Sequence, residues 1–346
     1  MENHWRHFLT DFGAAFVDDI VNDYGDRAAE YRAVLSSNVI ADLSHLGLIE
    51  VSGDDANEFL HGQFTSDVNA ITPRHSQLSA WCTPKGQVLV IFLIFRRGEH
   101  YYLLLPRELV DMTIHRLRGY VLRAAVAMAD ASTSLARIGI AGDDVATYLK
   151  HSVGDVPHVV NDATQNGTVT LLGISGPTPR FLAVGKAARL QAVWQALASE
   201  VTPVGAGPWA LLDILAGIPS IYPATSEAFL PQMLNLHALG ALSFQKGCFP
   251  GQEVIARVKY RGKLKRRTYL AHLDTDAVPD PGDALFEVKS RERIGQVLNA
   301  RPHPDGGIAM LAVIETEAAA STEVRLHRDE GPTVQVQPLP YSLNAA

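Results

Sequence analysis

An internal repeat is the feature of this sequence that restricts its fold most. Residues 46–60 read LGLIEVSGDDANEFL, and residues 135–149, which begin 89 positions later, read LARIGIAGDDVATYL. Each copy has the pattern of an apolar strand, a Gly-Asp-Asp turn and the start of a helix. We expect the aspartates of the two turns to cap helices rather than to catalyse, because a helix N-terminus favours acids. These aspartates are Asp54, Asp55, Asp143 and Asp144.

The segments after the two copies also correspond. The first copy continues with strand-like runs and then a helix-like run, at residues 78–83, 87–95, 100–105 and 107–122. The second continues in the same way, at residues 169–174, 181–184 and 187–197. Each unit reads as β-α-β-β-α, so the repeat predicts an α+β fold with two duplicated, ferredoxin-like modules rather than a doubly wound parallel sheet.

The two ends of the chain have different patterns. Apolar residues at helical spacing, from Phe8 to Ile20 through Phe12 and Phe16, predict an amphipathic N-terminal helix. Beyond residue 270, short apolar runs alternate with turn residues, which predicts a small C-terminal β-barrel. The expected parts are therefore an N-terminal helical segment (1–37), a first module (38–130), a second module with a connector (131–268) and the barrel (269–346).

Composition and charge exclude several classes of protein. The net charge of −7 argues against a surface that binds nucleic acid throughout. The longest apolar run, residues 88–95, is too short to span a membrane, and the first thirty residues lack a secretory signal. Two cysteines are too few for a disulfide framework, and the 13 histidines are scattered without metal-ligand spacing. We therefore expect a soluble, cytoplasmic, monomeric protein without a bound metal.

Residues 246–253, KGCFPGQE, combine a cation, a thiol, two glycines and a proline. The glycines permit backbone angles that other residues avoid, so the chain can turn sharply here and bring its amides close to a ligand. Cys248 lies two residues from Lys246, and a nearby cation favours the reactive thiolate. Two interpretations stay open, a functional thiol and a small buried hydrophobic residue.

A basic stripe comes directly after the loop, with seven cations within residues 257–267. They are Arg257, Lys259, Arg261, Lys263, Lys265, Arg266 and Arg267. The first five alternate with other residues, which predicts one face of a strand. Seven charges exceed what protection of an edge strand requires, so the stripe favours binding of phosphates or a polycarboxylate.

At these residues the chain resembles the YgfZ-type folate-binding proteins, relatives of the glycine-cleavage T-protein aminomethyltransferases and of mitochondrial iron–sulfur assembly proteins. The family signature K-G-C-[YF]-x-G-Q-E is present at residues 246–253. Further matching segments are residues 51–56, 59–60, 63, 65, 67–68, 84–86, 231–235 and 256–257. The resemblance thus covers residues 40 to 270.

This resemblance implies a cloverleaf of two α+β modules and a C-terminal β-barrel around a pocket for tetrahydrofolate or its polyglutamates. It also implies a role in the assembly or repair of iron–sulfur clusters, including those of tRNA-methylthiolating enzymes, with iron–sulfur proteins or their assembly machinery as partners. Cys248 would be the functional thiol. The residues implied in folate binding are Lys246, Gln252, Glu253 and Arg257, with Asp213 as a further candidate.

Two departures from the family pattern limit what carries over. Leu89 and Val90 stand where the aminomethyltransferases have acids beside the reacting folate nitrogen, and neither can transfer a proton. Leu215 stands where relatives commonly carry a Glu that accepts hydrogen bonds from the pterin. Losing such an acceptor costs about 1.5–3 kcal/mol unless Asp213 replaces it.

Three hypotheses of function stay open. The first is a tetrahydrofolate-binding accessory protein for iron–sulfur cluster maintenance that depends on Cys248. The second is a folate-dependent one-carbon transferase of the aminomethyl type, which the missing acids disfavour, so enzymatic activity is left open. The third is a module that binds tRNA or a partner protein through residues 257–267.

Overall fold

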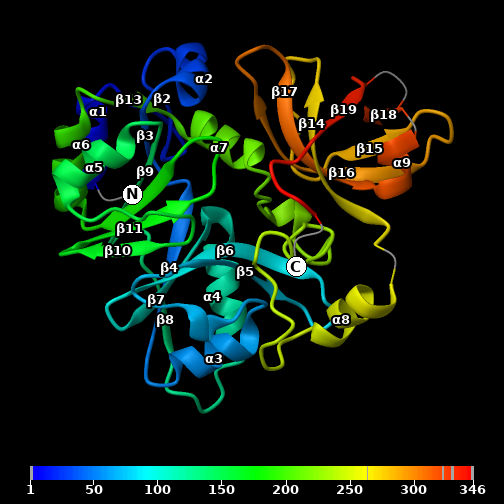
Figure 1. Cartoon of the computed structure of the whole chain (residues 1–346), viewed down its shortest axis with the longest axis horizontal. Coiled ribbons are helices and arrows are strands. Elements are labelled where there is room, and N and C mark those ends of the chain that lie inside the picture. The colour runs from blue at the N-terminus through cyan, green and yellow to red at the C-terminus, as the bar shows by residue number, and fades with distance from the viewer. Residues whose placement is uncertain (1–2, 263, 322, 329–330, 344–346) are drawn as a thin grey trace. The chain divides into compact units, whose positions relative to one another are not determined.

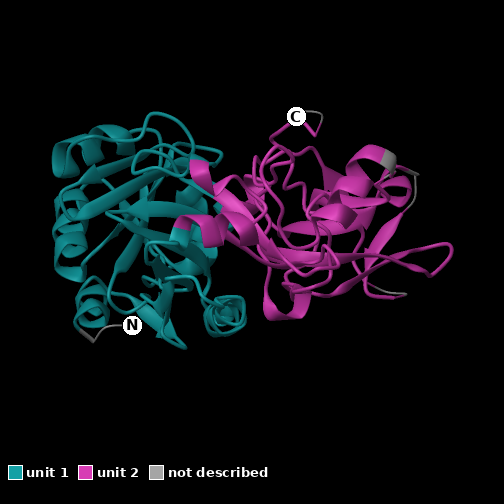
Figure 2. Cartoon of the chain, turned by 90° about the horizontal axis from the view of Figure 1, so that it is seen from below, with its two compact units in different colours: residues 1–56, 70–77, 93–212 teal, residues 57–69, 78–92, 213–346 magenta. Residues whose placement is uncertain are grey.

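A computed structural model describes residues 3–262, 264–321, 323–328 and 331–343. The chain forms two compact units, which Figure 2 shows in different colours. Unit 1 consists of Met1–Ala56, Ala70–Gln77 and Leu93–Leu212, and unit 2 consists of Asn57–Asn69, Leu78–Phe92 and Asp213–Ala346. None of the described helices is long and apolar enough to cross a membrane.

The N-terminal segment differs from the predicted continuous helix. It contains α1 (Asn3–Asp11), the hairpin of β1 (Ala15–Val17) and β2 (Ile20–Asp23), and α2 (Arg27–Ser36). After α1 the backbone turns at Gly13, which has a φ of +91°. Asp18 and Asp19 both have positive φ, the conformation of a tight hairpin turn, so Phe16 and Ile20 lie on strands and not on a helix.

The first repeat forms a five-stranded sheet with two helices (Figure 1). Its elements are β4 (Leu46–Ser52), α3 (Ala56–Gln63), β5 (Gln77–Cys82), β6 (Val88–Arg97), β7 (His100–Pro106), α4 (Val110–Arg118) and β8 (Ala127–Asp130), with the short 3-10 helices η1 (Val68–Ala70) and η2 (Arg107–Leu109). The strand order is β5-β6-β7-β4-β8. Most of β5 and the first half of β6 belong to unit 2, and the other strands belong to unit 1.

The second repeat lies within unit 1 and forms a six-stranded sheet. Its elements are β9 (Ala136–Ala141), α5 (Val145–Val153), β10 (Ala163–Asn166), β11 (Val169–Ile174), β12 (Arg180–Gly185), α6 (Ala187–Leu197) and β13 (Thr202–Val204), joined by β3 (Val39–Asp42). The order is β10-β11-β12-β9-β3-β13. Its core packs Ile138, Phe181 and Trp194 against Trp5 of α1, whose indole N–H donates to the buried Asp42 carboxylate at 2.8 Å.

The two repeats share the order β-α-β-β-β-α, and β5-β6-β7-β4 in one sheet corresponds to β10-β11-β12-β9 in the other. Each has three strands between its helices, whereas the ferredoxin-like arrangement has two. The turn after the first strand of each repeat requires a glycine, at Gly53 and at Gly142. A Cβ at Gly53 would lie 2.0 Å from the carbonyl oxygen of Ala125, and one at Gly142 would lie 2.2 Å from the side-chain oxygen of Asn38.

The predicted capping by the turn aspartates is confirmed in position at Asp144, but not in hydrogen bonding. Asp144 occupies the N-cap position of α5, but its side chain makes no capping hydrogen bond. The carboxylate of Asp55 instead accepts a hydrogen bond from the backbone N–H of Ala125 at 2.6 Å. Asp144 therefore has the predicted N-cap position without a capping hydrogen bond, and Asp55 supports loop packing, while the capping by Asp54 and Asp143 stays a prediction.

The C-terminal part of unit 2 is a curled, six-stranded half-barrel sheet, where the sequence predicted a barrel (Figure 1). Its elements are β14 (Arg266–Leu273), β15 (Ala284–Glu287), β16 (Arg293–Pro302), β17 (Ile308–Glu315), α9 (Thr316–Ser321), β18 (Val324–Leu326) and β19 (Val334–Gln337). The order is β18-β15-β16-β17-β14-β19, with every neighbouring pair antiparallel. Buried side chains such as Leu285, Val297, Met310 and Ile314 form its core.

Candidate functional site

The connector between the second repeat and the half-barrel contains the KGCFPGQE loop. It consists of α7 (Ala206–Leu215), the 3-10 helix η3 (Pro223–Thr225), an irregular stretch and α8 (Gln252–Arg261). Gly251 directly precedes α8 and has a left-handed φ of +81°. A Cβ at this position would lie 2.5 Å from the Cα of Gly86 and 2.6 Å from the carbonyl oxygen of Thr83. The loop therefore packs directly on the turn between β5 and β6.

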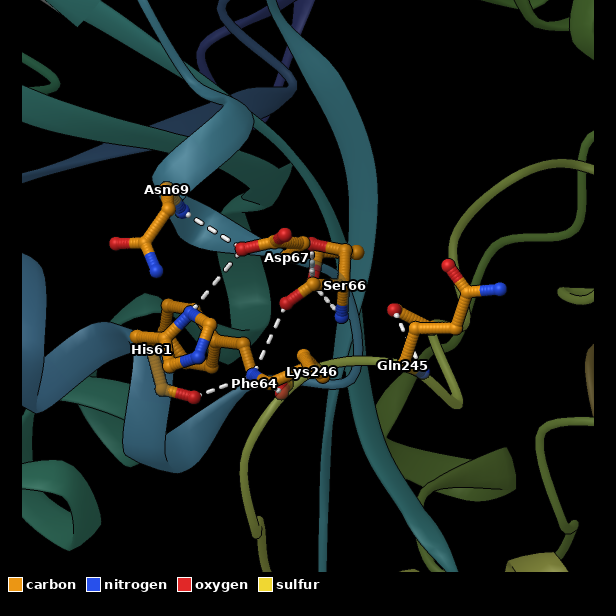
Figure 3. A network of polar contacts seen from close by, with 9 residues as sticks. His61, Phe64, Ser66, Asp67, Asn69, Gln245 and Lys246 are labelled. Carbon is orange, nitrogen blue, oxygen red and sulfur yellow. Dashed lines mark hydrogen bonds and ion pairs between the residues drawn. The ribbon is translucent and has the colours of Figure 1, made fainter.

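Lys246 anchors the N-terminal end of the KGCFPGQE loop. Its ammonium group donates to the carbonyl oxygens of His61, of Phe64 at 2.6 Å and of Ser66 at 3.0 Å (Figure 3). Burial lowers the pKa of Lys246 to about 8, although the nearby Asp67 carboxylate opposes this shift. The cation thus joins the loop to the C-terminal end of α3 through backbone acceptors.

His61 stands beside this cation. Its Nδ1 lies 3.3 Å from a carboxylate oxygen of Asp67, which also accepts a hydrogen bond from the backbone N–H of Asn69 (Figure 3). Burial and the positive charge of Lys246 lower the pKa of His61, and Asp67 opposes them. The imidazole is therefore favoured in its neutral form.

Cys248 is exposed, whereas Cys82 is buried in β5. Phe249, the residue after the thiol, is buried, and its ring centroid lies 5.4 Å from the ammonium nitrogen of Lys246. Buried or anchored residues thus flank Cys248 on both sides and leave its sulfur accessible. The interpretation of Cys248 as a buried hydrophobic residue is wrong. Because carbonyl oxygens accept the hydrogens of the Lys246 ammonium, a direct effect of this cation on the thiol stays a prediction.

The predicted basic strand over residues 257–267 is wrong in its first half, which is part of α8. Ile255 and Val258 have helical spacing, and Ile255 is fully buried, so apolar packing decides the conformation. On a helix, Arg257 and Lys259 point in different directions rather than along one face. Lys263 lies outside the described residues. Arg266 and Arg267 begin β14.

The other predicted folate-binding residues lie along the same connector. Gln252 and Glu253 form the first turn of α8, and Arg257 is exposed in its middle. Asp213 lies on α7, where its position two residues from Leu215 places the two side chains on different sides of the helix. Direct contact of these residues with folate stays a prediction.

A cavity of about 630 Å³ in unit 2 lies between residues that precede Lys246 and residues of α8 and β14. It is lined by Gln232, His237, Leu242, Ser243, Phe244, Gln245, Val258, Lys259, Gly262, Leu264 and Arg267. None of these described lining residues is acidic, whereas Lys259 and Arg267 are cationic. The cavity therefore suits an anionic ligand with an apolar body.

Two buried polar atoms of the cavity lining have no hydrogen-bond partner. They are Oε1 of Gln232 and Nδ1 of His237. Burial and the charges of Arg267 and Lys259 lower the pKa of His237. The amide nitrogen of Gln232 donates to the carbonyl oxygen of Ile255 at 2.6 Å, which fixes the direction of the free oxygen. A buried polar group without a partner is costly, so each atom needs a partner from outside the chain, either an ordered water molecule or a polar group of a ligand.

None of the eleven cavity-lining residues was a predicted site residue, and five of them also lay outside the recognised family segments and the basic stripe, namely His237, Leu242, Ser243, Phe244 and Gln245. Gln232 fell inside a recognised family segment, and Lys259 and Arg267 fell inside the basic stripe. Leu89 and Val90, which the resemblance puts at the position of the transferase acids, are buried in β6. Among the described residues, no three His, Cys, Asp or Glu side chains are placed to hold a metal ion.

Known proteins with the same fold define the class of this protein. The family model of the GCVT N-terminal domain matches residues 14–182. The structure is similar to that of the glycine cleavage system aminomethyltransferase T from Bartonella henselae, with a TM-score of 0.79, 17% identity and 96% coverage of both chains. The fold is therefore that of the aminomethyltransferase T proteins.

Curated relatives define the family more closely. The tRNA-modifying protein YgfZ of Yersinia pseudotuberculosis serotype O:1b (strain IP 31758) is 35% identical over 303 residues, which are 87% of this chain and 92% of the relative. The protein of the same name from Enterobacter sp. (strain 638) is 34% identical over 305 residues, with the same coverage. The chain belongs to the YgfZ family.

Proposed function

We propose that the protein is a tetrahydrofolate-binding accessory protein that supports the assembly or repair of iron–sulfur clusters, including those of tRNA-modifying enzymes. One observation carries the proposal: an exposed thiol, Cys248, lies on a loop that Lys246 and Gly251 hold in place. The related proteins named for tRNA modification support the cellular context. A single thiol does not supply the four ligands of a resident cluster, so Cys248 would act on a cluster or sulfur species held elsewhere.

The cavity residues fit folate. Leu242, Phe244 and Val258 offer an apolar wall for a heteroaromatic ring, and the free polar atoms of Gln232 and His237 could hydrogen-bond its edge. Arg267 supplies a guanidinium for the carboxylates of the glutamate tail. Together these residues would compensate for the missing acid at Leu215.

Aminomethyl transfer is not favoured as a second function. Leu89 and Val90 are almost completely buried, and neither carries a titratable group at the position of the transferase acids. The fold supports a further inference from the resemblance. The shared β-α-β-β-β-α order of the two repeats supports a duplication of the α+β module. We infer that the cloverleaf of the aminomethyltransferase T proteins is retained.

Complementation tests the role of the thiol. In a bacterial strain that lacks its own YgfZ-family gene, we expect the wild-type chain to restore iron–sulfur enzyme activity and tRNA methylthiolation. Cys248→Ala should abolish both while the purified variant keeps the wild-type melting temperature. Cys82→Ala, which removes the other sulfur, should still complement. Full complementation by Cys248→Ala would exclude the thiol from the function.

A further inference from the structure

The rim of the cavity differs from its interior. Inside, Gln232 is buried, and His237 and Arg267 are half-buried. On the outside, Arg257, Lys259 and Lys265 are exposed, and Tyr260 keeps 69% of its surface accessible. We call these four exposed residues the α8 rim. Of these four residues only Lys259 also lines the cavity, and all four are more exposed than the interior residues that we assign to folate.

Tyr260 and Lys259 form part of a mixed aromatic and cationic surface. The Tyr260 ring lies edge-on to Phe244 with centroids 6.2 Å apart. The ammonium nitrogen of Lys259 lies 4.0 Å from the Phe244 centroid and 5.8 Å from that of Tyr260. Because Ile255 and Val258 occupy the inward side of α8, Tyr260 presents much of its ring to solvent. An exposed ring beside cations is the usual platform for an unstacked nucleic-acid base.

The charge around the α8 rim is locally positive in a chain with a net charge of −7. Glu253 lies one turn before Arg257 on α8, and Glu315 neutralises Arg266 at 2.7 Å. These two acids limit the positive surface to the rim itself and to the acid-free cavity mouth. A short stretch of a polyanion therefore fits better than a long duplex.

We propose that the α8 rim binds a single-stranded segment of RNA. One base stacks on Tyr260, and phosphates contact Arg257 and Lys259, which lie to either side of this ring on α8, and Lys265. Stacking requires a base that is free of a duplex, which selects single strands. An acidic protein segment would pair with the cations but would make no use of the exposed ring. This site shares Lys259 and the contact with Phe244 with the lining of the folate cavity, whereas Arg257, Tyr260 and Lys265 do not line that cavity.

Fluorescence anisotropy with the full chain tests the proposal. The probe is a labelled 12-nucleotide single-stranded RNA, and a 12-base-pair RNA duplex is the comparison. We expect Tyr260→Ala to weaken binding of the single strand roughly tenfold and Tyr260→Phe to retain it. With three phosphate contacts, the plot of log affinity against log salt should have a slope of about −2, and Lys265→Met should reduce its magnitude by about 0.7. Lys150→Met, at an exposed position on α5, is the matched control and should leave the slope unchanged.

Each alternative result contradicts the proposal. Equal binding by wild type and Tyr260→Ala excludes stacking on this ring. A flat salt response excludes phosphate contacts. If poly-glutamate displaces the RNA and binds wild type and Tyr260→Ala equally, the rim is a docking surface for an acidic protein instead. Arg267→Met should leave RNA binding intact and weaken folate binding. A failure of the RNA proposal is therefore distinguishable from a failure of the folate proposal.

Discussion

The ammonium group of Lys246 donates a hydrogen bond to the carbonyl oxygen of Phe64 at 2.6 Å, across 182 positions of the sequence. With two further carbonyl acceptors, it anchors the loop that presents Cys248. We expect Lys246→Met to lower the free energy of unfolding by about 2 kcal/mol, because several charge-assisted hydrogen bonds are lost. Urea denaturation measures this, with Lys150→Met as the exposed control. Equal stability of Lys246→Met and wild type would contradict the anchoring role.

The same lysine makes stability depend on pH. Its pKa is about 8 in the folded chain and 10.5 in its ordinary state, so between these values the unfolded chain binds more protons. The pH-dependent part of the stability contributed by Lys246 is therefore fully present above pH 10.5 and is lost as the pH falls through 8, below which only the contribution of the hydrogen bonds remains. The difference in urea midpoint between wild type and Lys246→Met should grow from pH 7 to pH 10. A constant or shrinking difference would mean that burial does not lower this pKa.

Gly251 tests the close packing of the loop. Both Gly251 and Gly240 have left-handed φ angles, of +81° and +70°, but a Cβ would meet no atom within 4 Å at Gly240. Gly240→Ala should cost about 1 kcal/mol from backbone strain alone. Gly251→Ala should cost at least about 3 kcal/mol, because its Cβ would clash with Gly86. Similar melting temperatures for the two variants would show that the loop does not rest on the β5–β6 turn.

The two cysteines should differ in reactivity. Cys248 is exposed, and burial raises the pKa of the Cys82 thiol. A thiol reagent such as Ellman's should therefore titrate one fast-reacting sulfur in the native protein and two after denaturation. Cys248→Ala should remove the fast phase. A fast phase that persists in this variant would place the accessible sulfur at Cys82.

The repeat was the most reliable guide to the fold, because Gly53 and Gly142 enforce the same turn after the same apolar strand. The N-terminal prediction of a helix was right for α1 but wrong beyond Asp11, because the spacing of Phe8, Phe12 and Phe16 carries no information on the tight turn at Asp18 and Asp19. Over so few residues, a hairpin and a helix can show the same spacing of apolar side chains. The tight turn at Asp18 and Asp19, and not the spacing of the apolar residues, selected the hairpin over a longer helix.

The site was predictable only in part. The KGCFPGQE loop is recognisable from its sequence, but the role of Lys246 is not, because its partners are backbone carbonyl oxygens that leave no trace in residue type. Alternating cations suggested a strand over residues 257–267, whereas burial of Ile255 selected a helix. His237 became a candidate only when folding placed it beside Arg267 and Lys259.

Calorimetric titration with tetrahydrofolate tests the central claim most directly. The wild-type chain should bind one equivalent, and Arg267→Met should bind at least about tenfold more weakly, because it removes a charged partner of the tail carboxylates. Lys150→Met should bind as wild type. Absence of binding to wild type, or equal binding by Arg267→Met, would contradict the assignment of this cavity to folate.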